Sequence, residues 1–136
     1  MWPKETIPDE AKLYRWVKNS YFVDGEVGPG AFRNSTDPDG NKTDGMSVNW
    51  DEYSTCEGTR DDLAHEGRNP DEYGVVAMTA QMVRTMVVPV QIVEHEPTTG
   101  NRAHSEVKGE KTKKTQKMLR DVASICVFPR VEHMPA

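Results

Sequence analysis

The spacing of apolar and polar residues predicts several short strands. Residues 12–17 combine aromatic and β-branched side chains in rough alternation, which favours a strand, although residues 8–10 could instead start a short helix. The apolar runs 46–50 and 74–78 have the length and composition of buried strands. In 88–92, every second residue is Val or Ile, which predicts a further strand with one apolar face. Pro89 indicates an edge or a bulge there.

Helical spacing is clearest near the C-terminus. Over residues 110–123, a rotation of about 100° per residue places Met118, Leu119 and Val122 on one side of a helix. The basic residues on the opposite side are Lys113, Lys117 and Arg120. Residues 124–128 either extend this helix or form a closing strand, because Pro129 follows them.

Two shorter helices are expected from their capping residues. Ser54 followed by Glu57 resembles a capping box and predicts a helix through about Glu66. Thr79 is the expected N-cap of a helix over 80–86, with Val83 and Met86 facing inward.

These elements predict one α+β domain with a small mixed or antiparallel sheet and two or three helices. The 136 residues are enough for one hydrophobic core. We expect an irregular arm over 1–11, the domain over 12–128 and a tail over 129–136. Residues 24–45 are rich in Gly, Pro, Asp and Asn and predict a long loop, which Ala31 and Phe32 anchor.

Charge, apolar segments and cysteine content indicate which partners and which cellular compartment to expect. A net charge of -5 and a pI near 5.4 argue against non-specific coating of nucleic acid. The N-terminus lacks an apolar signal segment and no apolar run is long enough to span a bilayer, so we expect a cytoplasmic protein of bacterial or phage origin without membrane contact. Cys56 and Cys126 are far apart in sequence and are expected to be two free thiols.

The richest polar segment is 94–106, called here the polar elbow. It holds His95 and His104 with several carboxylates and Arg102, and we expect His95 and Arg102 to serve in binding. Two histidines and a glutamate could in principle hold a metal ion. Since no His-x-x-x-His spacing occurs, solvated loop histidines without metal are the preferred interpretation.

Two other segments suggest ligands. The residues 37–44 resemble the start of a calcium loop but have Lys42 at the sixth position and Val48 at the twelfth, which favours consecutive Asx turns. The basic side of the C-terminal helix, formed by Lys113, Lys117 and Arg120, could bind phosphate or be a solvated face.

Three separated residues carry a resemblance to an enzyme family. Arg15, Ser47 and Glu106 occur in the order of the arginine, serine and glutamate of ADP-ribosyltransferases. That resemblance implies NAD as cofactor, an arginine on its pyrophosphate, a serine on its ribose and a glutamate at the reacting centre. Ser47 lacks the family's Ser-Thr-Ser setting, and His104 stands where a second acid or glutamine is usual. A related alternative gives His104 a phosphate contact, as in RNA phosphotransferases.

A second resemblance covers most of the chain. The segments 13–15, 31–32, 46–48, 74–76 and 103–109 look like those of small bacterial proteins of unassigned role. It implies no activity, cofactor or partner.

Taken together, the residues favour a small binding protein that contacts a protein or nucleic acid through the polar elbow and the basic helix side. The alternative is a transferase that uses NAD or a nucleotide, with Arg15, Ser47, His104 and Glu106 as catalytic residues.

Overall fold

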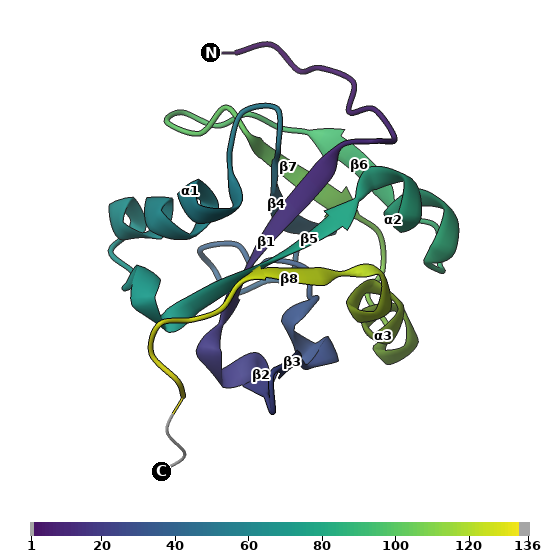
Figure 1. The fold of residues 1–136 in the computed structure, drawn as a ribbon. Helices are drawn as coiled ribbons and strands as arrows, with labels where there is room; N and C mark the ends of the chain where they lie inside the picture. The colour runs from purple at the N-terminus through teal and green to yellow at the C-terminus, as the bar shows by residue number, and fades with distance from the viewer. Residues whose placement is uncertain (1, 134–136) are drawn as a thin grey trace.

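A computed structural model describes residues 2–133 and has an antiparallel six-stranded sheet at its centre, in the order β6-β7-β4-β1-β5-β8 (Figure 1). The strands are β1 (Lys12–Lys18), β4 (Gly45–Trp50), β5 (Tyr73–Thr79), β6 (Ile92–His95), β7 (His104–Lys108) and β8 (Ser124–Val127), with β2 (Phe22–Val23) and β3 (Glu26–Val27) forming a separate hairpin. The α-helices are α1 (Cys56–Asp61), α2 (Ala80–Met86) and α3 (Lys113–Val122). Short 3-10 turns are η1 (Asn19–Tyr21), η2 (Pro29–Ala31), η3 (Asp62–Glu66) and η4 (Pro70–Glu72). The predicted α+β class is confirmed, and the sheet is antiparallel throughout.

The sheet has one largely apolar face. Along β4, Met46, Val48 and Trp50 are buried in the main core, whereas Ser47 and Asn49 point to the other face, as the two-residue period of a strand requires. Helix α2 packs against β5, β6 and α3, and residues of both helices join the core. Helix α1 packs against β1, β5 and β8. Because Thr59 of α1 bonds the Asn49 side chain, α1 covers the face opposite the core.

The expected helices form with small shifts at their ends. Thr79 caps α2 as predicted and accepts a hydrogen bond from the Met82 N–H. Helix α1 is capped by Thr55 rather than Ser54, with the Gly58 N–H as donor. It ends at Asp61 and continues as η3 through Glu66, because Gly58 and a scarcity of apolar side chains weaken a longer α-helix. Helix α3 has the predicted inward face, with Leu119 fully buried.

Two expectations about the end of α2 and the segment after it are wrong. Met86 is 56% exposed instead of facing the core. The strand expected over 88–92 begins only at Ile92, and Val88, Val90 and Ile92 are all exposed. Pro89 has no N–H for a sheet ladder, and the Val88 carbonyl accepts from Thr115 of α3 instead. Strand β6 is an edge strand, and Pro89 lies before it rather than within it.

The two cysteines form a disulfide, which corrects the expectation of free thiols. The Cys56 and Cys126 Sγ atoms are bonded, with Cα atoms 6.6 Å apart and a sequence separation of 70. The sheet order explains their proximity, since β8 lies beside β5 and α1 packs against both. Residues 124–127 thus form the closing strand β8, and the bond ties it to the start of α1.

The long loop and the two ends are held by packing and hydrogen bonds. Ala31 and Phe32 are buried and anchor the loop as predicted. The Asp37 carboxylate accepts from two loop N–H groups in an Asx turn. Residues 2–11 of the arm form no helix or strand, yet Ile7 is 2% exposed. Arg130, at the start of the expected tail, pairs with Asp71. Residue 1 of the arm and residues 134–136 of the tail lie outside the described residues.

Candidate functional site

A cleft of about 700 Å³ lies on the sheet face opposite the core. Its floor comes from β1, β4 and β7, one wall from α1 and η3, and the other from the turn 98–101 of the polar elbow. We call it the Ser47–His104 cleft. The lining residues are Trp16, Ser47, Asn49, Thr59, Asp62, Leu63, His65, Glu66, Thr98, Thr99, Gly100, Asn101 and His104. Its volume falls in the range usual for small-molecule sites.

A hydrogen-bond network joins the floor to both walls. Asn49 is 2% exposed, and its Nδ2 donates to Thr59 Oγ1 of α1 at 3.2 Å. Its Oδ1 accepts from Asn101 Nδ2 of the elbow at 3.0 Å. Thr59 Oγ1 is also 3.0 Å from Ser54 Oγ. Since each wall is bonded to the same buried amide, the cleft has its shape before any ligand arrives.

Two of the predicted catalytic residues meet at the floor. Asn49 pairs with His104, and Ser47 with Glu106, across the β4–β7 ladder. His104 Nδ1 lies 2.8 Å from the Glu96 carbonyl oxygen. Because a carbonyl only accepts, Nδ1 carries the proton and Nε2 keeps its lone pair in the neutral ring. Nε2 lies 3.4 Å from Ser47 Oγ and is thus placed to accept from that hydroxyl.

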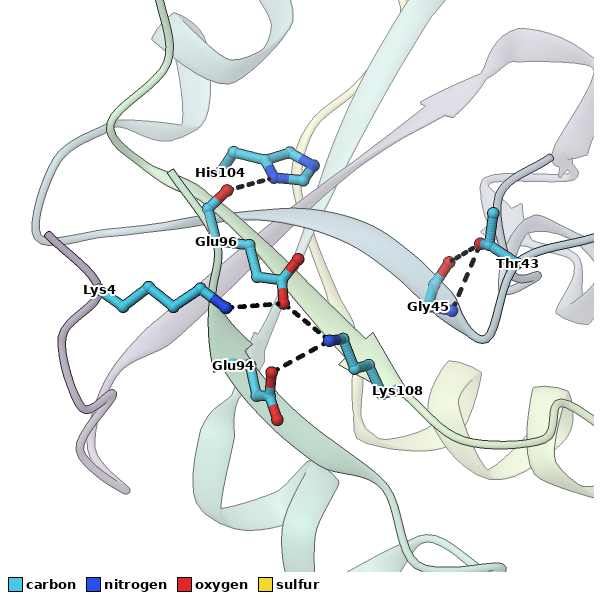
Figure 2. Close-up of polar contacts among 7 residues, drawn as sticks. All are labelled: Lys4, Thr43, Gly45, Glu94, Glu96, His104 and Lys108. Atoms are coloured by element: carbon cyan, nitrogen blue, oxygen red, sulfur yellow. Dashed lines mark hydrogen bonds and ion pairs between the residues drawn. The ribbon is translucent and has the colours of Figure 1, made fainter. Parts of the chain in front are cut away.

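A cluster of charged side chains adjoins the cleft on β6 and β7 (Figure 2). Lys108 Nζ lies 2.7 Å from Glu96 Oε1 and 3.0 Å from Glu94 Oε2. Lys4 of the arm reaches the same Glu96 oxygen at 3.4 Å. Glu106 lies among them, because β7 runs between β4 and β6 and Glu106 is directly opposite Glu94 in the β6–β7 ladder.

Glu106 and Glu96 share a proton. Their carboxyl groups are hydrogen-bonded to each other, and the pKa of Glu106 is raised to about 7, chiefly by burial and then by the bond and charge of Glu96. The pKa of Glu96 is lowered to about 2, chiefly by the bond from Glu106 and then by Lys108. Glu106 therefore holds the proton below about pH 7, where Glu96 is already ionised. Gly45 leaves the space for this carboxyl group, because a Cβ there would collide with Glu106 Oε1.

The shared proton gives an expected pH dependence of stability. A raised folded-state pKa contributes stability that is full below the unfolded value and lost as the pH rises through about 7. We expect the free energy of unfolding to fall by about 1 kcal/mol as the pH rises from the unfolded value of 4.5 through about 7, after allowing for solvent screening at this half-buried site. Urea unfolding at a series of pH values measures it. The contribution of Glu96 has the opposite sign and is lost only as the pH falls below its unfolded value toward about 2.

A pair of variants isolates the group responsible. Glu106→Gln should abolish the loss between pH 4.5 and about 7, because the amide keeps a donor and cannot ionise. Glu94→Gln removes a carboxylate from the same cluster but leaves the shared proton, so its profile should follow that of the unchanged protein. The same slope in Glu106→Gln and in the unchanged protein would contradict the assignment.

Arg15 is held away from the other three predicted catalytic side chains. It lies between Leu13 and Val17, two residues from each, so the two-residue period of the strand places its side chain with these buried residues on the core face of β1. Its Nη1 donates to the Ser47 carbonyl at 2.9 Å, and its Nε and Nη2 donate to the Ala31 carbonyl. Burial lowers the pKa of Arg15 to about 10. The arginine thus ties η2 to β4, and it is not among the cleft-lining residues.

His95 is buried rather than solvated at a loop tip, which corrects that expectation. It is 2% exposed and lies against the rings of Trp50 and Tyr53. The Glu5 N–H donates to its Nδ1 at 3.0 Å, so Nε2 carries the proton and donates to the Arg102 carbonyl at 2.7 Å. His95 therefore connects the N-terminal arm to the polar elbow.

The remaining predicted binding residues do not form one surface with the cleft. Arg102 lies over the Tyr53 ring, 4.2 Å from its centroid. Lys113 and Lys117 are exposed on α3, and Arg120 pairs with Asp121. Helix α3 and the polar elbow lie on opposite sides of the molecule (Figure 1). The sequence therefore correctly indicated a basic helix side, but not a continuous surface between it and the elbow.

Several cleft residues carried no signal in the sequence. Trp16, Asn49 and Thr59 were assigned to ordinary strands or helices, because side-chain alternation alone does not reveal which face of a sheet is left partly uncovered. Asp62 and Glu66 fell within the helix predicted through about Glu66 and were given no role. The unusual feature that points to them is the helix 56–66, which is polar nearly all round and yet packs on a sheet.

Neither family models, nor curated proteins, nor solved structures gave a match to this chain. Within residues 2–133, no three His, Cys, Asp or Glu side chains lie close enough together to hold a metal ion. No helix of the described residues has the length and apolar content needed to cross a bilayer. The geometry of the cleft is therefore the basis for assigning a function.

Proposed function

We propose that the protein binds a small molecule that is neutral or positively charged and rich in hydroxyl or amino groups, in the Ser47–His104 cleft. The observation that carries the proposal is the lining itself. Hydroxyl, amide and imidazole groups of Ser47, Asn49, Asn101 and His104 offer donors and acceptors beside the indole of Trp16. A few placed polar groups next to an aromatic ring are typical of small-ligand sites.

The charge of the cleft selects among ligands. Its acidic groups are Asp62 and Glu66 on the η3 wall, and among residues 2–133 its lining includes no lysine or arginine. A phosphate or pyrophosphate would therefore meet like charges without a cationic partner. An amine or a polyhydroxylated ligand would instead gain hydrogen bonds to the carboxylates. This favours an amino sugar or a polyamine over NAD or a nucleotide.

Other functions remain separate predictions. Contact with a protein or nucleic acid through Lys113, Lys117 and Arg120 of α3 would use a different side of the molecule. ADP-ribosyl transfer would require Arg15 to grip a pyrophosphate, and three N–H groups of Arg15 are already engaged by main-chain carbonyls. Binding of a small molecule is the preferred function, because the Ser47–His104 cleft gives it a defined site.

The proposal is tested by NMR titration of the ¹⁵N-labelled protein with glucosamine, spermidine, glucose and AMP. We expect glucosamine or spermidine to shift the signals of residues 98–101 and the Trp16 indole. The double variant Asp62→Asn with Glu66→Gln should weaken the cationic ligands at least tenfold, which is about 1.4 kcal/mol.

A matched control uses the tryptophan of the arm. Trp16→Ala should also weaken binding, whereas Trp2→Ala should not, because Trp2 does not line the cleft. Tighter binding of AMP than of the amines, or shifts confined to α3, would overturn the proposal.

A further inference from the structure

The Ser47 and His104 side chains have the relation of a nucleophile to its general base. The Ser47 hydroxyl faces the unprotonated Nε2 of His104 at 3.4 Å, and the Glu96 carbonyl fixes the ring from its other side at 2.8 Å. A nucleophile, a base and a third group that orients the base are the parts of an activated serine. Such contacts are often long without substrate and shorten when it binds.

A second hydroxyl lies beside the first. Ser35 Oγ is 3.1 Å from Ser47 Oγ. If Ser47 donates its hydrogen to His104, Ser35 donates to Ser47 and keeps the nucleophilic oxygen oriented. Once Ser47 Oγ forms a bond to carbon, the Ser35 hydroxyl is free to donate to the negative oxygen that develops next to it.

The position of the pair in the molecule matters as much as its geometry. Both residues line the Ser47–His104 cleft, so a bound molecule can reach them. Ser47 lies on a central strand and His104 on its neighbour, with β1 and β6 flanking them, so the sheet keeps the two side chains in register.

We propose that Ser47 and His104 hydrolyse a carboxylic ester of a hydroxyl-bearing ligand of the class that the cleft binds, such as an O-acylated amino sugar. This inference rests on the proposed binding function and adds a reaction to it. Water is the co-reactant, and the products are a carboxylic acid and the alcohol of the ligand.

The reaction proceeds in two halves. Ser47 Oγ gives its proton to His104 Nε2 and forms a bond to the ester carbonyl carbon; the bond from that carbon to the alcohol oxygen then breaks, and Nε2 returns the proton to the leaving alcohol. In the second half, a water gives a proton to Nε2 and attacks the acyl carbon. The bond to Ser47 Oγ breaks, and that oxygen takes the proton back from His104.

A fluorophosphonate probe tests the nucleophile directly. We expect intact-mass analysis to show one adduct on the folded protein, and peptide mapping to place it on Ser47. Labelling should disappear in Ser47→Ala and slow at least 100-fold in His104→Gln, while Ser124→Ala, a change on an exposed position of β8, should label like the unchanged protein.

Folding and binding are controlled separately. Protein unfolded in urea should not label, which separates an activated serine from a merely exposed one, and circular dichroism checks that each variant is folded. No adduct on the folded protein, an adduct elsewhere, or unchanged labelling of His104→Gln would overturn the dyad. If glucosamine or spermidine still shifts the cleft signals in that case, the binding function stands and only the hydrolysis is lost.

Discussion

Removing the disulfide should lower the free energy of unfolding by about 4 kcal/mol, if both Cys56 and Cys126 are replaced by serine. The bond closes a loop with 70 residues of sequence separation, and the entropy that such a link removes from the unfolded chain predicts a stabilisation of this size. The double replacement avoids a lone thiol that could form other bonds. Urea unfolding of the double variant, compared with the unchanged protein, measures the difference.

Reduction provides the matched control. Dithiothreitol should lower the stability of the unchanged protein to that of the double variant and leave the double variant unaffected. Two thiols titrated in the unreduced, folded protein, or equal stabilities, would contradict the bond. Because Cys56 begins α1, and Thr59 of α1 lines the cleft, the double variant should also bind cleft ligands more weakly than the unchanged protein.

The bond also bears on where the protein is expected to work. Structural disulfides persist in oxidising compartments and are rare where glutathione and thioredoxin keep thiols reduced. The cytoplasmic location expected from the sequence remains a prediction, and the Cys56–Cys126 bond does not favour it.

Elements with strong local signals were predictable from the sequence. Thr79 caps α2 where expected, and α3 buries Leu119 on the side that the helical period indicated. Both depend on interactions within about one turn of the chain, which the sequence displays directly. Strand β1 was likewise found from its own alternation. The same kind of signal failed at Val90, since the exposed course of 88–91 depends on how α2 and α3 meet there.

The candidate site was predictable only in part, because it is built across the sheet. Ser47 and His104 were chosen as polar residues in the right chemical class, but their contact depends on the β4–β7 register, which no local pattern fixes. Arg15 lies on the core face of β1, whereas Ser47 and His104 lie on the cleft face of β4 and β7. His95 looked solvated because neighbouring residues are polar, whereas its burial comes from Trp50 and the N-terminal arm, which are distant in sequence.

Arg15→Leu should be the most destabilising single change in the vicinity of the site, lowering the free energy of unfolding by about 3 kcal/mol. The guanidinium satisfies the Ala31 and Ser47 carbonyls, and leucine would leave both acceptors without this donor in a buried setting. Thermal and urea unfolding measure the loss. A pyrophosphate clamp would behave differently: the variant would keep its stability and lose affinity for NAD.

Two comparison variants separate charge from geometry. Arg15→Lys keeps the positive charge but has no planar fork to reach both carbonyls, so it should recover less than half of the lost stability. Arg33→Leu makes the same chemical change at an exposed position of the neighbouring loop and should alter stability by no more than about 0.5 kcal/mol. If Arg15→Leu is as stable as Arg33→Leu, the carbonyl contacts do not hold η2 against β4. If both variants of Arg15 unfold early while Arg33→Leu does not, the arginine has a structural role: its fork joins the loop to the strand that carries Ser47.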